Sequence, residues 1–99
     1  MASLIILYWR DIPAQIIARA GRTSAKRELS KRFIEAIDRC AMHTKATASE
    51  DYLDEWRRGD PMPCGDDLQA EAAAAMARIE TAFDDARLKR LVEAGGRDE

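Results

Sequence analysis

The most apolar stretch of the chain lies near its N-terminus. Residues 4–9 form an uninterrupted run of aliphatic and aromatic residues, a length and composition typical of a buried strand. Side chains of a strand alternate between two faces, so both faces of this strand are apolar and both need cover. Arg10–Ile12 then marks a turn, and Pro13 leads into a second apolar segment, Ala14–Arg19. The pattern predicts an antiparallel hairpin, with a helix opening at Pro13 as the alternative.

Two further patterns predict helices in the middle of the chain. Over residues 25–43 apolar side chains recur at helical spacing, with charged residues on the opposite side and Thr23 or Ser24 as the N-cap. The capping-box spacing of residues 47–50 predicts the start of a shorter helix, which ends near Gly59. The first helix is the longer and more amphipathic of the two.

The last third of the chain predicts a loop followed by two helical segments. Residues 59–65 hold two prolines and two glycines, which favour an irregular extended path. Asp66 and Asp67 then stand where a helix N-terminus favours negative charge. The apolar stripe that runs from Leu68 changes side after Phe83, which predicts a kink or a fresh helix over 85–93.

Together these elements predict an α+β fold in which an N-terminal two-stranded antiparallel hairpin is packed by three to four helices. Residues 1–96 form one domain and residues 97–99 a frayed tail. Two strands alone are only marginally stable, so helices must cover at least one face. The second face is covered either by the chain's own helices or by another chain, and the pattern leaves both open.

Composition and charge narrow the class of protein. The chain is 46% hydrophobic and 34% charged, which excludes wholesale disorder. Residues 1–45 carry nine Lys and Arg against four Asp and Glu, whereas residues 46–99 carry seven against fourteen. This asymmetry indicates either complementary packing of the two halves or a polarised surface for a partner. No signal peptide, membrane span or disulfide framework is predicted, which favours a cytoplasmic protein.

The cysteines are the candidates for chemistry. Cys64 precedes a predicted helix N-terminus, which favours a thiolate, but Asp66 and Asp67 beside it raise the pKa of the thiol instead. Cys40 and His43 stand three residues apart, a spacing too loose for a metal motif. A structural role for both cysteines is favoured, with no metal or cofactor, and Cys64 is kept as the single catalytic candidate.

Basic residues are concentrated on and before the predicted helix 25–43, as in a nucleic-acid-binding helix. However, Glu28, Glu35 and Asp38 interrupt that surface, and no recognised nucleic-acid-binding motif is present. A solvated face is the favoured interpretation.

Two segments place a tryptophan beside arginine and aspartate, at Trp9–Asp11 and Trp56–Asp60. Trp and Arg are enriched at the energetic centres of protein interfaces. The alternative is that both tryptophans are core residues with charges at the rim. The predicted partner-binding residues are Tyr8, Trp9, Arg10, Asp11, Ile12, Arg57, Arg58 and Asp60.

The blocks WRDIPAQ, EWRRGDP and PCGDD, with the helical segments between and after them, give the chain a family resemblance. Over nearly its whole length it resembles a family of small bacterial "virulence factor" domains. The resemblance implies no catalytic residues. It also implies an association with bacterial one-carbon metabolism, in the company of methylenetetrahydrofolate-reductase-like and corrinoid methyltransferase proteins.

The sequence therefore favours a non-enzymatic accessory or adaptor subunit. Such a subunit docks onto a larger cytoplasmic protein, such as a one-carbon enzyme, or onto a second copy of itself, through the hairpin and its Trp/Arg surface. Two alternatives remain: a small enzyme or redox protein that uses Cys64, and a nucleic-acid-binding domain that uses the basic helix 25–43.

Overall fold

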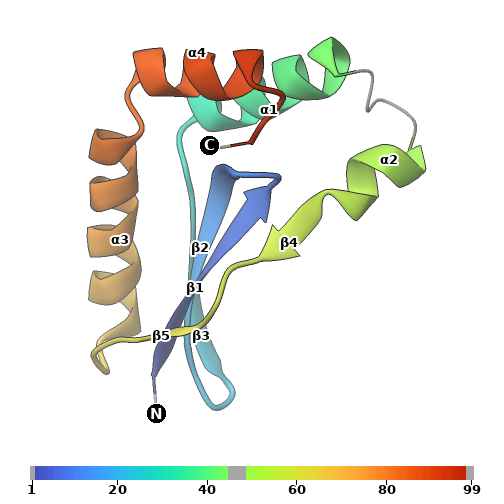
Figure 1. Cartoon of the computed structure of the whole chain (residues 1–99). Coiled ribbons are helices and arrows are strands. Elements are labelled where there is room, and N and C mark those ends of the chain that lie inside the picture. Colours follow the sequence, from blue (N-terminus) through green and yellow to red (C-terminus); the bar gives the residue numbers. More distant parts are fainter. Residues whose placement is uncertain (1, 45–48, 98–99) are drawn as a thin grey trace.

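The computed structural model describes residues 2–44 and 49–97, which fold into one antiparallel sheet and four helices (Figure 1). The α+β class is therefore confirmed, but the sheet has five strands rather than the two predicted. The strands are β1 (Ser3–Trp9), β2 (Ile12–Ala20), β3 (Thr23–Glu28), β4 (Trp56–Arg58) and β5 (Met62–Pro63). The helices are α1 (Lys31–His43), α2 (Ser49–Asp54), α3 (Leu68–Ala82) and α4 (Asp85–Glu93).

The predicted hairpin is present as β1 and β2, and the alternative of a helix after Pro13 is wrong. Its turn lies at Arg10 and Asp11, and Arg10 has a φ of 55°, a conformation that is uncommon for a residue with a side chain. The order of the strands is β3-β2-β1-β4, and β5 also pairs with β1. The register shifts between Leu7 and Tyr8, because Ala14 of β2 has no partner there.

The prediction of a helix over 25–43 is wrong in its first third. Residues 23–28 form β3, which pairs along β2 so that Ala25 lies opposite Ala18. The helix begins only after Ser30, which takes the extended N-cap conformation, and it ends at His43 as predicted. The difference arises because pairing with an apolar strand overrides the helix propensity of a short charged segment.

The predicted second helix is present as α2, but its predicted end near Gly59 is wrong. Helix α2 stops at Asp54, and Trp56–Arg58 forms β4 on the edge of β1 that β2 leaves free. Thr47 and Ala48 of the predicted capping box lie outside the described residues. A second short strand, β5, lies within the loop 59–65 and pairs with the start of β1.

The two C-terminal helices are confirmed. The Asp67 carboxylate caps α3 by accepting a hydrogen bond from the Ala70 N–H at 3.2 Å. A separate helix, α4, starts after Asp84, whose carboxylate accepts from the Arg87 N–H at 2.8 Å. The chain direction therefore changes at Phe83, where the apolar stripe changes side.

The core lies on one face of the sheet. Helix α3 packs on β2 and β3, and α1 packs on β2 and α4. Small residues face each other where α3 meets the sheet, with Ala72 and Ala75 buried on the helix and Ala18 and Ala25 buried on the strands. Close approach of helix and sheet leaves little empty space there, as stable cores require.

Candidate docking face of the sheet

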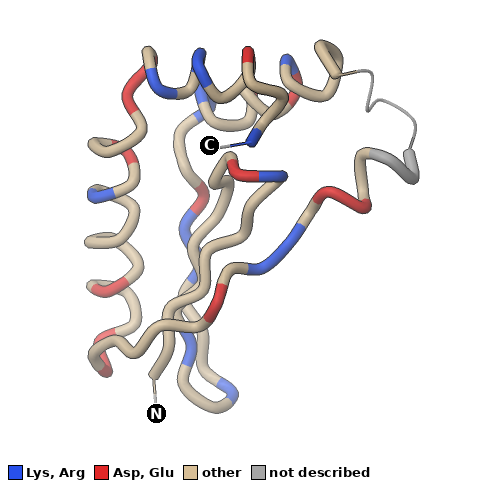
Figure 2. Tube along the Cα trace, viewed as in Figure 1, with Lys and Arg blue, Asp and Glu red and all other residues tan. Residues whose placement is uncertain are grey.

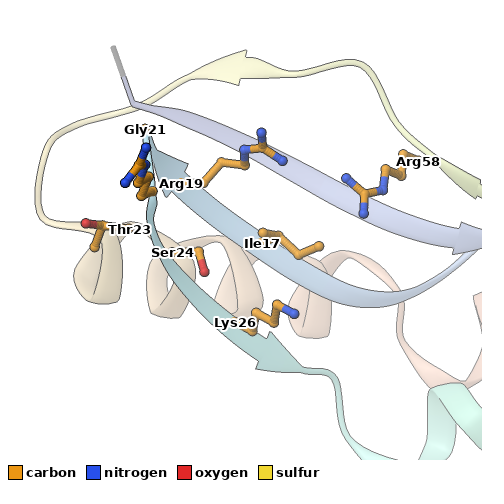
Figure 3. Close-up of a pocket in the computed structure, with 8 residues that line it drawn as sticks. Ile17, Arg19, Gly21, Thr23, Ser24, Lys26 and Arg58 are labelled. Carbon is orange, nitrogen blue, oxygen red and sulfur yellow. The ribbon is translucent and has the colours of Figure 1, made fainter.

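The face of the sheet that points away from α3 carries its own row of apolar residues. Ile17 lies opposite Ile5 on one side and Lys26 on the other, and Leu7 lies opposite Gln15. Directly opposed residues share a face, so Ile5, Leu7 and Ile17 line this face together. Ile5 and Ile17 lie outside the core cluster and are 7% and 8% exposed, although no helix of the described residues covers Ile17 (Figure 3). We call this surface the open sheet face.

One end of the open sheet face is an apolar hollow of about 180 Å³. Helix α1 forms one wall through Ile34, whose side chain is 45% exposed, and β4 forms another through Trp56. The residues that line it are Leu7, Ala14, Gln15, Glu28, Ile34 and Trp56. Exposed aliphatic groups beside a half-buried tryptophan are suited to bury an apolar side chain of another protein.

The other end of the open sheet face, near the turn between β2 and β3, is a basic hollow of about 260 Å³ (Figure 3). Its lining residues are Ile17, Arg19, Gly21, Arg22, Thr23, Ser24, Lys26 and Arg58. The four cations are exposed, and none forms an ion pair with any residue that the structure describes. Figure 2 shows the basic residues of this turn at the end of the sheet, whereas acidic residues mark both ends of α3.

The predicted partner-binding residues divide into buried and surface groups. Trp9 and Ile12 have no exposed surface; the Trp9 indole N–H donates to the Tyr52 carbonyl at 2.9 Å. The Tyr52 ring lies between the rings of Trp9 and Trp56, with centroid distances of 5.7 and 6.0 Å. These aromatic residues fix the position of α2 and β4, so Trp9 and Ile12 support the surface from beneath.

The hairpin turn is held by an ionic network, which we call the tip cluster: Arg10, Asp11, Glu55, Arg57, Gly95, Gly96 and Arg97. Arg10 forms an ion pair with Glu55 at 2.6 Å and donates to the Gly95 carbonyl at 2.6 Å. Glu55 also pairs with Arg97 at 2.9 Å. The N–H of Asp11 donates to the Gly96 carbonyl at 2.8 Å. The tip cluster thus joins the turn, the start of β4 and the segment after α4.

Beside the tip cluster lies a groove of about 430 Å³, which contains four of the predicted residues: Tyr8, Asp11, Arg57 and Asp60. Arg57 pairs with Asp11 at 2.8 Å, and its guanidinium carbon lies 4.6 Å from the centre of the Tyr8 ring. Arg58, the last predicted residue, points to the open sheet face instead (Figure 3). The structure therefore separates Arg57 from Arg58 although they are adjacent in sequence, because successive strand residues face opposite sides.

The two cysteines lie in different environments. Cys40 is fully buried in the core, and burial raises the pKa of its thiol. Cys64 is half-buried, and its pKa is raised by burial and by the carboxylates of Glu71 and Asp66. Both shifts favour the thiol over the nucleophilic thiolate. Among the described residues, no three His, Cys, Asp or Glu side chains are arranged to hold a metal ion.

A family model described as "Virulence factor" matches residues 7–92. The chain belongs to this family. Comparison with curated proteins found no match, and comparison with solved structures found none. Within the described residues of this virulence-factor domain, no helix has the length and apolar character needed to cross a membrane.

Two features of the virulence-factor domain differ from what the sequence pattern predicts. The apolar stripe predicted over 25–43 includes Ile34, which is instead 45% exposed and lines the apolar hollow. The predicted helix 25–43 includes Lys26, which instead lies on β3; Arg19 lies on β2, as the predicted second strand requires. Residues 23–28 contain a single apolar residue, Ala25, so no alternation in the sequence indicates β3.

Proposed function

We propose that this virulence-factor domain is a non-enzymatic docking module that binds a larger protein through the apolar hollow of its open sheet face. The observation that carries the proposal is the one-sided cover of the hairpin. The helices cover one face of β1 and β2, whereas Ile5, Leu7 and Ile17 form an apolar row on the other. Ile5 and Ile17 are only 7% and 8% exposed, so the accessible apolar surface lies at the end of the row. There the exposed Ile34 and the partly exposed Leu7 and Trp56 are suited to a partner.

The apolar hollow supplies the contacts that such docking needs. Leu7, Ile34 and Trp56 line the hollow and offer apolar contacts to an inserted side chain. Gln15 and Glu28 supply the polar part of the lining. Charged residues of the neighbouring strands border the hollow. Such charges contribute more to the orientation of a bound partner than to the affinity of binding. The same features support binding to a protein better than binding to a small polar substrate.

The proposal is tested by capture of a partner from the cells of origin with the tagged, full-length chain. Ile34→Asp removes apolar surface from the hollow and is expected to abolish capture of a specific protein. Met62→Asp is the matched control, because Met62 is also 45% exposed but lies on β5, outside the hollow. Equal capture by both variants would contradict the proposal.

Light scattering across a dilution series measures the oligomeric state and tests the same surface a second time. A monomer that becomes a defined complex with the captured protein supports an accessory subunit. A concentration-dependent dimer that Ile34→Asp dissociates would instead assign the hollow to a second copy of the chain. Mass spectrometry of the captured protein tests the one-carbon enzyme that the family resemblance implies.

The two alternative functions receive less support. A Cys64-dependent enzyme requires a thiolate, whereas the surroundings of Cys64 raise the pKa of its thiol. Alkylation by iodoacetamide well below the usual thiol pKa, with loss of an activity in Cys64→Ser, would favour that alternative. A nucleic-acid-binding domain would use a basic helix over 25–43. Residues 25–28 belong to β3 instead, so that helix is shorter than this alternative requires.

A further inference from the structure

The basic hollow gathers four positive charges around a small concave surface. Arg19 and Lys26 come from β2 and β3, Arg22 from the turn between them, and Arg58 from β4. Within residues 2–44 and 49–97, no acidic residue lines the hollow. Like charges at close range raise the energy of the folded protein. A bound anion lowers this electrostatic repulsion.

The other lining groups suit an oxyanion. Ser24 lies opposite Arg19 and contributes a hydroxyl group to the same face, and Ile17 adds an apolar side chain with 8% exposure. Hydrogen bonds from a guanidinium to an oxyanion are charge-assisted, which makes them shorter and stronger than those between neutral groups. Arginine binds phosphate oxygens in pairs through its planar group, which is why arginine predominates in phosphate sites.

The size and lining of the hollow select among phosphate-bearing ligands. About 260 Å³ matches one or two phosphate groups and a small attached moiety. Sites for single-stranded nucleic acid stack bases on aromatic side chains, but no aromatic residue lines the hollow. A single carboxylate would leave most of the four positive charges unmatched.

We infer that the basic hollow is a binding site for a small phosphorylated molecule, held through its phosphate groups by Arg19, Lys26 and Arg58. The ligand lies at the turn end of the open sheet face, away from the apolar hollow. This site is independent of the proposed function, because Ile34 and Trp56 line only the apolar hollow. Failure of either proposal therefore leaves the other standing.

The test is a titration of the isotope-labelled full chain with inorganic pyrophosphate, followed through backbone amide resonances at constant ionic strength. Saturable shifts are expected for Gly21, Thr23 and Ser24, with little change at residues of α1 and α4. Non-saturating shifts, or shifts spread over basic residues throughout the chain, would overturn the proposal. Citrate that binds as tightly as pyrophosphate would also overturn it, because the site would then recognise charge alone.

Variants assign the binding to the hollow. Arg19→Ala and Arg58→Ala are each expected to weaken pyrophosphate binding by about tenfold, the loss of one charged hydrogen-bond donor. Arg78→Ala, which removes the same charge from the exposed surface of α3, is the control and should bind like the parent chain. Equal weakening by all three variants would overturn the site. Arg58→Gln provides a second variant should Arg58→Ala fail to fold.

A single-stranded oligonucleotide is the final arm of the experiment. A small-ligand site predicts that the oligonucleotide binds no more tightly than pyrophosphate at equal phosphate concentration. Tighter binding, with shifts that extend from the basic hollow along the sheet, would reject the small ligand in favour of nucleic acid.

Discussion

The two ends of the hairpin use arginine in opposite ways. At the tip cluster, Arg10 and Arg57 are paired with Glu55 and Asp11 of the same chain. At the basic hollow, Arg19, Arg22 and Arg58 have no ionic partner among the described residues. Paired arginines join segments that are distant in sequence and stabilise the fold, whereas unpaired arginines remain available to a ligand. The comparison predicts large stability effects at the tip and small ones at the hollow.

The largest effect is expected from Trp9→Ala, beneath the tip cluster. The change removes a fully buried side chain and its hydrogen bond to the Tyr52 carbonyl. A loss of about 3–5 kcal/mol in the free energy of unfolding is expected, measured by urea denaturation. A loss below about 1 kcal/mol would mean that the tip does not hold the fold together.

The next effect is expected from Gly96→Ala. Gly96 has a φ of 81°, and a Cβ at this position would lie 3.0 Å from both Arg10 Cδ and Cys40 Sγ. Left-handed backbone strain and overpacking together predict a loss of about 2–4 kcal/mol in unfolding free energy. Gly21→Ala is the control, since its φ is also positive but its Cβ meets nothing within 4 Å. Equal losses would show that contact with the tip cluster contributes nothing.

Arg10→Ala tests the paired arginine directly. It removes the ion pair with Glu55 and the hydrogen bond to the Gly95 carbonyl from a side chain that is 17% exposed. A loss of about 2 kcal/mol is expected, again from urea denaturation. Arg97→Ala, which removes the more exposed partner of Glu55, should cost less. A larger loss of stability from Arg97→Ala than from Arg10→Ala would contradict the role of Arg10 in holding the tip cluster together.

Another paired arginine, Arg32, extends the comparison to the junction of α1 and α3. Arg32 pairs with Glu80 at 3.0 Å and donates to the Phe83 carbonyl, while Ser30 donates to Glu80 through its N–H and hydroxyl. Burial raises the pKa of Glu80, but these donors outweigh burial and lower it overall.

Because the pKa of Glu80 is lower in the folded chain, its stabilisation is complete above the unfolded pKa and is lost as the pH falls through the folded pKa. Glu80→Gln is expected to cost about 1 kcal/mol at neutral pH and to reduce the acid sensitivity of unfolding. Denaturation midpoints at neutral and acidic pH provide the measurement. An unchanged difference between the two midpoints would contradict this role of Glu80.

The smallest stability effects are expected at the basic hollow. Arg19→Ala and Arg58→Ala should change the free energy of unfolding by less than about 0.5 kcal/mol, because these exposed side chains have no internal partner. Relief of repulsion makes a slight gain in stability the expected sign. A loss comparable to that of Arg10→Ala would contradict the distinction between paired and unpaired arginines.

The sequence predicted the parts of the fold that depend on local signals. The continuous apolar run of β1 and the acidic caps before α3 and α4 were each decisive, because each signal lies within its own element. Strands β3 and β4 were missed because their short, charged sequences become strands only by pairing with β2 and β1. Long-range pairing also separates Arg57 from Arg58, which no single-sequence pattern specifies.

For the candidate site, the sequence predicted that one face of the hairpin needs cover, but not where the exposed contact residues lie. The prediction that Trp9 and Ile12 contact a partner rests on their residue types and their place in the sequence. Both side chains are fully buried, so neither reaches the surface. A helical stripe predicts burial of Ile34, yet it lies at the border of the buried face of α1, beside the fully buried Phe33 and Ile37, and is 45% exposed. The position of a helix on a sheet is a tertiary property.

Site-specific photo-crosslinking tests the docking claim most directly. A photoreactive benzoylphenylalanine is placed at position 34, beside the apolar hollow, and in a second chain at position 62, on an equally exposed surface away from it. Irradiation in the cells of origin is expected to give one specific adduct of higher mass from position 34 and none from position 62. Absence of an adduct at position 34, or the same adducts from both positions, would contradict docking through the open sheet face.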